Sequence, residues 1–344
     1  MKKIKNIIFI ILSLMIMLTS CDKINQMIGK DGKVGLYPIR VGDKEGYIDA
    51  TGKIVINPQF DQAYNFSEGL ACVRIGDKWG YIDKNGQFAI NPQFIWARDF
   101  SEDGLARVLV GDWGTGKIGF IDAKGNMAIQ PQYEVAFYFT DGLASVKNGD
   151  KWGFINKTGE FVINPQFDMV NPFNDGLALV GIGGLFGYID KTGKFVINPQ
   201  FVKAYDFSEG LAPVMIDDKW GFIDKKGNIV IDPQFDNIVT LFLDGVSAVM
   251  ISDRCGYIDK SGKYVINPQF DMVGGFYEGL SLAMIGGKWG FIDKKGKFVI
   301  NPQYDKAYSF NQDLAPVFMN KQFQWINKNG ETVWTGELPS AYYE

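Results

Sequence analysis

The sequence predicts an all-β protein, built as a tandem array of about eight repeats that are each about 34 residues long and three-stranded. A glycine followed by an aromatic residue, Ile and Asp or Asn returns at nearly constant intervals. No long stretch after the N-terminal segment keeps a helical period. A chain with 46% hydrophobic and only 22% charged residues can bury a large core. The marker glycines, spaced 34 or 35 residues apart except for one interval of 39, are Gly46, Gly80, Gly119, Gly153, Gly187, Gly221, Gly256 and Gly290.

The N-terminus has the pattern of an export signal. Three lysines precede an apolar run over residues 7–18 that is too short to span a membrane. The quartet Leu18-Thr19-Ser20-Cys21 follows it and resembles the lipobox of bacterial lipoproteins, which implies lipidation of Cys21. We expect a signal peptide over 1–20, a lipidated tether over 21–35 and a place in the cell envelope, lipid-anchored to a bacterial membrane, with the outer membrane or cell surface preferred. The alternative is an ordinary secretory signal.

Charge and residue usage exclude several function classes. Removing the three signal lysines from the formal charge of −4 leaves −7 for the mature chain, which argues against nucleic-acid binding. The sequence has no histidine, the commonest general base and metal ligand. Cys72 and Cys255 stand at non-equivalent repeat positions, so we interpret them as small buried hydrophobic residues rather than a disulfide. We expect no enzyme activity, no cofactor and no metal ion.

Within each repeat, short β-prone runs are separated by turn residues. Tyr81-Ile82-Asp83 and residues 87–90 flank Lys84-Asn85-Gly86, where Asp before the turn and Gly at its end predict a type I turn with a left-handed glycine. Residues 211–216 and 219–223 predict a second tight hairpin. The variable connector between repeats, such as residues 202–207, is expected to form one helical turn.

The strand shared by the two hairpins begins with Lys-Trp-Gly in four repeats. It stands at Lys78-Trp79-Gly80, Lys151-Trp152-Gly153, Lys219-Trp220-Gly221 and Lys288-Trp289-Gly290. These units resemble the bacterial WG, or KWG, β-repeat family. The resemblance implies an exported or surface-associated repeat protein and supplies no catalytic residue.

The two ends of the array, which spans 36–335 and is followed by a tail over 336–344, look like two parts of one further unit. Residues 36–41 match the last strand of a repeat, while residues 325–334 match its first hairpin. Terminal pairing would close a propeller-like ring. Half-units also serve as caps of an open array, and we favour a curved, open, solenoid-like array over the closed ring.

Repetition also decides which residues are candidates for function. The Asp of the first turn recurs in seven repeats and is replaced by Asn156 and Asn327 in two, which suits a turn residue and not a catalytic carboxylate. Binding along an array uses the positions that vary between units. Candidate binding residues are the connector aromatics Tyr64, Trp96, Phe137, Tyr205 and Tyr308. Packing between repeats is the alternative role for these rings.

Two functions follow from this reading. The first is a membrane-anchored, non-catalytic binding module for a protein, peptide or envelope glycan. The second is a structural or spacer lipoprotein of the envelope that has no specific ligand.

Overall fold

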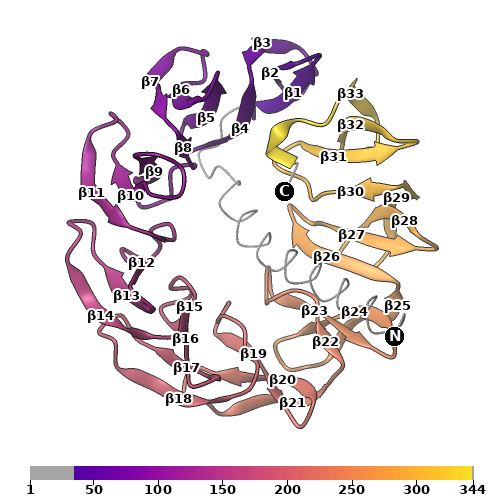
Figure 1. Ribbon diagram of the computed structural model, residues 1–344. Helices are drawn as coiled ribbons and strands as arrows, with labels where there is room; N and C mark the ends of the chain where they lie inside the picture. Colours follow the sequence, from indigo (N-terminus) through magenta and orange to yellow (C-terminus); the bar gives the residue numbers. More distant parts are fainter. Residues whose placement is uncertain (1–34, 343–344) are drawn as a thin grey trace, which may run out of the picture.

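The computed structural model describes residues 35–342, which form a closed ring of nine small antiparallel sheets, numbered here as blades 1 to 9 in chain order (Figure 1). The predicted signal peptide and almost all of the predicted tether lie outside the described residues. Blades 1 to 3 contain β1 (Tyr37–Val41), β2 (Lys44–Ile48) and β3 (Ile54–Phe60); β4 (Gln62–Ser67), β5 (Leu70–Ile75), β6 (Lys78–Ile82) and β7 (Phe88–Phe94); and β8 (Trp96–Ala97), β9 (Ala106–Val110), β10 (Lys117–Ile121) and β11 (Met127–Tyr133).

The other six blades repeat the same order of strands. Blades 4 to 6 contain β12 (Ala144–Asn148), β13 (Lys151–Ile155) and β14 (Phe161–Phe167); β15 (Met169–Val170), β16 (Ala178–Ile182), β17 (Leu185–Ile189) and β18 (Phe195–Phe201); and β19 (Leu211–Ile216), β20 (Lys219–Asp224) and β21 (Ile229–Phe235). Blades 7 to 9 contain β22 (Asn237–Ile238), β23 (Val246–Ile251), β24 (Arg254–Asp259) and β25 (Tyr264–Phe270); β26 (Met272–Tyr277), β27 (Leu280–Ile285), β28 (Lys288–Ile292) and β29 (Phe298–Tyr304); and β30 (Lys306–Ala307), β31 (Leu314–Met319), β32 (Gln322–Asn327) and β33 (Thr332–Gly336).

Each blade is an antiparallel meander that runs from the inner side of the ring outwards (Figure 1). The all-β repeat prediction is confirmed, but the helical turn expected in the connector is wrong. The connector is extended and pairs with the next strand, as β4 does with β5 and β8 with β9. The described residues contain a single short 3-10 turn, Ser340–Tyr342, and none of their helices has the length and apolar character needed to cross a membrane.

The turn before the last strand of each blade confirms the predicted role of its Asp. In blade 2, Asp83 Oδ1 accepts hydrogen bonds from the backbone N–H of Asn85 and of Gln87, each at 2.9 Å, and Gly86 has a φ of 79°. Asn156 accepts the corresponding two bonds at 3.0 Å. An amide therefore replaces the carboxylate without loss of the turn, because the turn requires only an acceptor oxygen.

The glycine of the Lys-Trp-Gly motif packs against a second recurring motif, Asn-Pro-Gln, which stands at residues 91–93 in the last strand of blade 2. The pairing of β6 with β7 shifts between Trp79↔Phe94 and Tyr81↔Ile90, so residues 91–93 bulge across Gly80. A Cβ at Gly80 would lie 2.6 Å from both Ile90 O and Pro92 N. Only glycine allows the bulge to fold this closely over the neighbouring strand.

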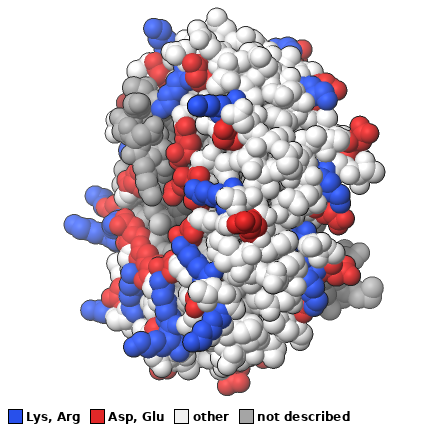
Figure 2. All heavy atoms as spheres, turned by 90° about the vertical axis from the view of Figure 1, so that its left-hand side faces the viewer, with Lys and Arg blue, Asp and Glu red and all other residues white. Residues whose placement is uncertain are grey.

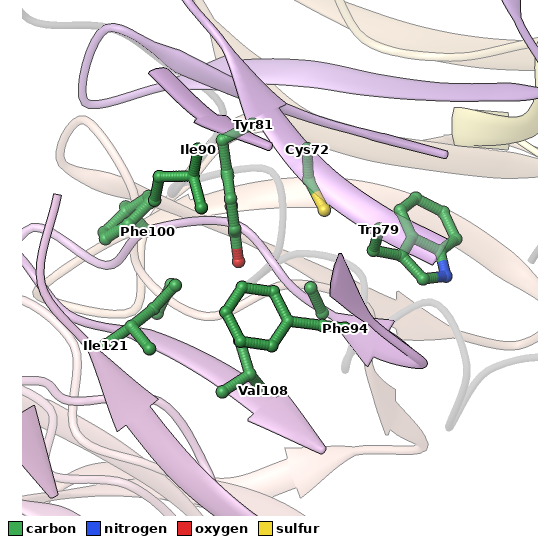
Figure 3. Close-up of a cluster of buried hydrophobic side chains, with 10 residues drawn as sticks. Cys72, Trp79, Tyr81, Ile90, Phe94, Phe100, Val108 and Ile121 are labelled. Carbon is green, nitrogen blue, oxygen red and sulfur yellow. The ribbon is translucent and has the colours of Figure 1, made fainter. Parts of the chain in front are cut away.

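The core lies between blades rather than inside each one. Figure 3 shows the cluster between blades 2 and 3, in which Tyr81 of one blade points toward Val108 and Ile121 of the next and Trp79 lies at the side of the cluster. The Tyr81 hydroxyl donates to the carbonyl of Arg98 in the next blade at 2.7 Å. A single blade has no partner for its apolar face, so stability depends on stacking the blades.

Acidic side chains join consecutive blades at both ends of the meander. Asp61 accepts from Lys44 Nζ of blade 1 and from the N–H of Gly76 of blade 2, each at 2.6 Å. On the opposite rim, Asp103 of blade 3 accepts from the N–H of Gly142 at 3.1 Å and pairs with Lys157 of blade 4 at 2.8 Å. These carboxylates hold neighbouring turns in register.

The ring is closed by contacts between blade 9 and blade 1. Tyr37 and Trp325 are almost fully buried with ring centroids 5.2 Å apart, and Trp325 Nε1 donates to Pro38 O at 3.1 Å. Asp313 N donates to the Tyr37 hydroxyl at 3.0 Å. Of the two arrangements considered above, the structure therefore has the closed ring and not the favoured open array. The reason is that the two ends bury aromatic surface against each other.

The segment after β33 completes blade 1 on its inner side. A β-bridge joins Glu337 to Arg40 of β1, at the place where Gln62 pairs with Arg74 in blade 2. Glu45 occupies the repeat position of Trp79 and is fully buried. Its carboxylate accepts from the N–H and the hydroxyl of Ser340, both at 2.7 Å, and from Ala63 N at 2.6 Å. Burial raises the pKa of Glu45, although these hydrogen bonds oppose the rise.

The outer wall of the ring is formed by the last strand of each blade and carries few charges. Figure 2 shows acidic and basic side chains along the two rims, with a mostly uncharged wall between them. Exposed Val162 and Val196 belong to this wall. These are edge strands, and the proline in the bulge, such as Pro165, removes a donor that another edge would pair with.

Candidate binding site on the inner strands

The predicted connector aromatics lie half-buried on the inner strands and connectors, and three of them stack on a framework tryptophan. Ring centroids are 5.0 Å apart for Tyr64 on Trp79 and 4.8 Å for Tyr205 on Trp220. Phe137 stacks on Trp152 at 5.3 Å, and Tyr308 lies 5.5 Å from Tyr342 at the closing junction. They therefore pack within their own blades or at the closing junction and form no single continuous patch. Their role in binding remains a prediction.

Blade 3 departs from the repeat at two facing positions. Arg107 lies opposite the aromatic residue that follows the marker glycine, and in the other blades this position holds only uncharged residues. They are Pro38, Cys72, Ser145, Leu179, Pro213, Ala248, Leu282 and Pro316. The backbone N–H of Arg98 donates a hydrogen bond to the carbonyl of Arg107 at 3.1 Å. Other repeats likewise have an uncharged residue at the connector position of Arg98. These residues are Tyr64, Phe137, Asn171, Tyr205, Val239, Gly274 and Tyr308.

Trp96 brings these two arginines into one cluster. The guanidinium carbon of Arg98 lies 4.8 Å from the centroid of the Trp96 ring, and that of Arg107 lies 5.8 Å from it. Arg98 Nη1 also donates to the hydroxyl of Tyr64 at 3.1 Å, and Arg107 Nη1 donates to the carbonyl of Ala136 at 2.8 Å. Blades 2, 3 and 4 thus all contribute to fixing the two guanidinium groups.

The cluster brings like charges together in a partly buried place. Burial lowers the pKa of Arg107 to about 10, and the neighbouring charge of Arg98 acts in the same direction, while Asp99 opposes it. Arg107 remains protonated at neutral pH, so its charge persists there. Arg74 of blade 2 lies 6.0 Å from the Trp79 ring and adds a third guanidinium on the inner strands. The sequence reasoning selected Trp96 but missed Arg107, although comparison of the repeats position by position would have found it.

The cysteines and the turn carboxylates of the described residues are buried or form part of turns. Cys72 and Cys255 are buried, as predicted, and burial raises the pKa of both thiols, that of Cys255 to about 11. Among residues 35–342 no group of three potential ligand side chains is placed to hold a metal ion. Turn carboxylates such as Asp122 have a lowered pKa because the amide of Asn126 and backbone N–H groups donate to them.

The repeat unit itself matches a known family. A family model described as WG containing repeat matches eight consecutive segments that begin at residue 46 and end at residue 323. The chain belongs to the WG containing repeat family. The matched segments of this WG repeat protein are 46–79, 79–112, 118–152, 152–186, 186–220, 220–255, 256–289 and 289–323.

Solved structures similar to this WG repeat protein are distant from it. Hsv2 of Kluyveromyces lactis is 12% identical with a TM-score of 0.40, covering 79% of this chain and 96% of that chain. A quinonprotein alcohol dehydrogenase-like protein of Bacteroides thetaiotaomicron is 12% identical with a TM-score of 0.36, covering 89% and 93%. Similarities at this level carry no argument about function. Comparison with curated proteins gives no match.

Proposed function

We propose that this WG repeat protein is an exported lipoprotein whose ring is a non-catalytic binding module for a protein, a peptide or an envelope glycan. The observation that carries the proposal is the cluster of Trp96, Arg98 and Arg107. Most polar side chains that recur in the repeats form turns or join blades, whereas these three depart from the repeat and meet on the inner side of blade 3, at β8 and β9. Repeat arrays bind partners along extended surfaces, and the positions that vary between units are the candidates for contact with a partner.

The proposed absence of catalysis rests on the roles of the candidate groups. The sequence has no histidine to serve as a general base. The recurring carboxylates accept hydrogen bonds from their own turns, as Asp83 does, or join neighbouring blades, as Asp61 does. Neither use leaves a carboxylate oriented toward a substrate.

Membrane attachment through Cys21 is supported by the lipobox resemblance of residues 18–21 and by the apolar run before it. We place the ring in the cell envelope, at the outer membrane or cell surface. Cys21→Ser should abolish incorporation of labelled palmitate and release the protein from the membrane fraction. Unchanged labelling of this variant would refute the anchor.

Binding is tested by exposing the purified protein to arrays of peptidoglycan fragments, glycans and envelope proteins. We expect saturable capture of a specific subset. In a second arm, Tyr64, Phe137, Tyr205 and Tyr308 are replaced together by Ser, with circular dichroism confirming that the ring is folded. Loss of capture by this folded variant would assign binding to the connector aromatics. Uniform silence of the unmodified protein would instead favour the spacer role.

A further inference from the structure

The tight turns that precede the Lys-Trp-Gly strands lie on one rim of the ring, called here the tip rim. An ion pair covers this rim at six junctions between blades of the described chain. It joins a basic residue two positions before the marker glycine to an acidic residue at the start of the next connector, as Lys219 pairs with Asp236. The other five pairs are Lys44–Asp61, Lys117–Glu134, Lys151–Asp168, Arg254–Asp271 and Lys288–Asp305.

The junction between blades 5 and 6 replaces both members of this ion pair. Leu185 and Val202 stand there at the places that Lys219 and Asp236 have in the next junction. Their side chains are 38% and 66% exposed. Exposed aliphatic surface is unfavourable in water, so a rim that faces only solvent gives no reason for this double exchange.

Further apolar side chains lie beside this pair on the tip rim. Ile182 pairs with Leu185 across the tip turn of blade 5, and Met169 lies on the neighbouring inner strand. Val135 has the place of Met169 in blade 4, and all three side chains are also exposed. Residues 177–189, which form the blade 5 hairpin, include no charged residue. Contiguous apolar patches of this kind mark contact with a membrane or another protein.

Blade 3 adds a tryptophan to the same rim. Its hairpin tip is a loop over residues 111–116, whereas the tips of the other eight blades have two residues between the last paired positions. The N–H of Gly116 donates to the carbonyl of Asp112 at 2.7 Å and closes the loop. Trp113 is 69% exposed, more than any other large apolar side chain of residues 35–342. The longer loop therefore presents an indole ring to whatever the tip rim contacts.

We propose that these exposed side chains hold the tip rim of blades 3 to 6 against a phospholipid membrane. The inference rests on the proposed envelope lipoprotein and adds how the ring is oriented on the membrane. We call the contact surface the apolar arc. Its members are Trp113, Val135, Met169, Ile182, Leu185 and Val202.

The composition and placement of the apolar arc favour a membrane over a protein partner. Five of its side chains offer no hydrogen-bonding group, and tryptophan is a residue typical of the boundary between lipid and water. They belong to four consecutive blades, in the left and lower part of the ring in Figure 1, and lie at the same end of their hairpins. A flat surface can contact them together, whereas a short peptide would cover only one or two.

The proposed lipid anchor can reach a membrane on this side of the ring. Gly35 lies at the opposite rim, because β1 begins there and its five residues end at the tip turn of blade 1. A strand of this length is roughly 17 Å long. The sequence from residue 21 to residue 34 spans at most about 50 Å. Its length is therefore sufficient for the tip rim to lie on the membrane that holds Cys21.

The valines of the outer wall are a poorer candidate for this contact. Val162 and Val196 occupy one position of the repeat, and most blades have valine there. They follow the curved wall around the whole ring, so a flat membrane would meet only a small part of them (Figure 1). The apolar arc, in contrast, is confined to one sector and one rim.

The test measures cosedimentation with vesicles of pure phosphatidylcholine at millimolar lipid, using the mature chain with Cys21→Ser so that no acyl group contributes. The site variant adds Leu185→Lys with Val202→Asp, which installs the ion pair that Lys219 and Asp236 form at the next junction. The matched control adds Val162→Lys with Val196→Asp, the same exchange at outer-wall side chains of similar exposure. Trp113→Ser is a second site variant, because its loop lies outside the paired strands.

We expect the Cys21→Ser chain and the control to bind the vesicles, with little dependence on salt. The Leu185→Lys, Val202→Asp variant should lose at least about tenfold in partitioning, and Trp113→Ser should lose part of it, both with unchanged melting temperatures. Side chains alone bind lipid weakly and reversibly, so the Cys21→Ser chain is still released when a membrane fraction is washed.

Equal partitioning of both site variants and the Cys21→Ser chain, or no vesicle binding by that chain, would overturn the inference. An equal loss in the control would place the contact on the outer wall instead. Dimers of the Cys21→Ser chain in sedimentation velocity that the site variant abolishes, without vesicle binding, would make the arc a contact between two copies. Palmitate labelling of Cys21 without vesicle binding refutes the inference alone, and vesicle binding without labelling refutes only the proposed lipid anchor.

Discussion

The contact between Glu45 and Ser340 should hold the C-terminal segment on blade 1. Glu45→Ala removes the acceptor of three buried donors: the N–H and hydroxyl of Ser340 and the N–H of Ala63. Each buried donor left without a partner costs about 1–3 kcal/mol. The C-terminal segment relieves part of this by moving into water, so we expect a loss of roughly 3–5 kcal/mol in the free energy of unfolding, the range for breaking a buried charged contact.

Two measurements check this expectation. Urea unfolding followed by tryptophan fluorescence gives the change in stability, and carboxypeptidase digestion reports release of the C-terminal segment. Glu134→Ala is the matched control, since Glu134 forms an exposed ion pair with Lys117 on the rim and should change neither measurement. Ser340→Ala should reproduce part of the effect and add little to Glu45→Ala. Unchanged stability together with an intact segment in Glu45→Ala would refute the proposed role of the contact.

The carboxyl group of Glu45 should also make the stability of the protein depend on pH. Because burial raises the pKa of Glu45 above its unfolded value of 4.5, the native state binds the proton more tightly, and the resulting stability is present below pH 4.5 and lost as pH rises through the raised pKa. Asp61 acts oppositely, because hydrogen bonds lower its pKa from 3.8 and its contribution is lost only below that pH. The difference in stability between the unmodified protein and Glu45→Gln isolates the first effect. We expect it to shift in favour of the unmodified protein as pH falls from 7 toward 4.5, and a constant difference would contradict the assignment.

Three further predictions concern the repeat framework. Gly80→Ala should destabilise the protein by about 1–3 kcal/mol in urea unfolding, because the new Cβ would lie 2.6 Å from the backbone of the bulge. The control Gly274→Ala should cost less, because the nearest atom there belongs to a side chain at 3.3 Å. Equal effects would refute the close packing of the bulge on Gly80. Trp220→Ala should cost about 3–5 kcal/mol by the same assay, and a loss within experimental error would show that its burial contributes nothing. Iodoacetamide should label Cys72 and Cys255 only after unfolding, because both are buried with raised pKa values; rapid labelling of the native protein would contradict this.

The repeat unit was predictable from the sequence because each motif acts locally. The Asp83 turn depends on hydrogen bonds spanning two and four residues, and such bonds are visible as a recurring Asp-x-x-Gly. The connectors were harder to predict. Residues 202–207 have no alternating pattern, and their extended form is imposed by pairing with the neighbouring strand, as Ala204 pairs with Val214.

Closure and the arginine cluster depend on contacts between residues far apart in sequence or in different blades. Open and closed arrays have the same repeat pattern, and the deciding contact of Tyr37 with Trp325 joins the two ends of the chain. Arg107 stands in an ordinary strand pattern, and only the structure shows that its guanidinium shares the Trp96 ring with Arg98. Neither arrangement follows from local sequence alone.

The closing junction also sets the order in which the ring can assemble. A contact between neighbouring blades, such as Ser67 with Phe100, joins residues 33 apart, whereas the bonds from Ser340 to Glu45 join residues 295 apart. Closing a flexible loop of that length costs on the order of 5 kcal/mol in chain entropy. Blades that have already stacked bring the ends together and remove most of this cost. Refolding should therefore proceed as growth of a curved array followed by a late step in which the C-terminal segment docks on the first blade, and Glu45→Ala should slow only that last phase.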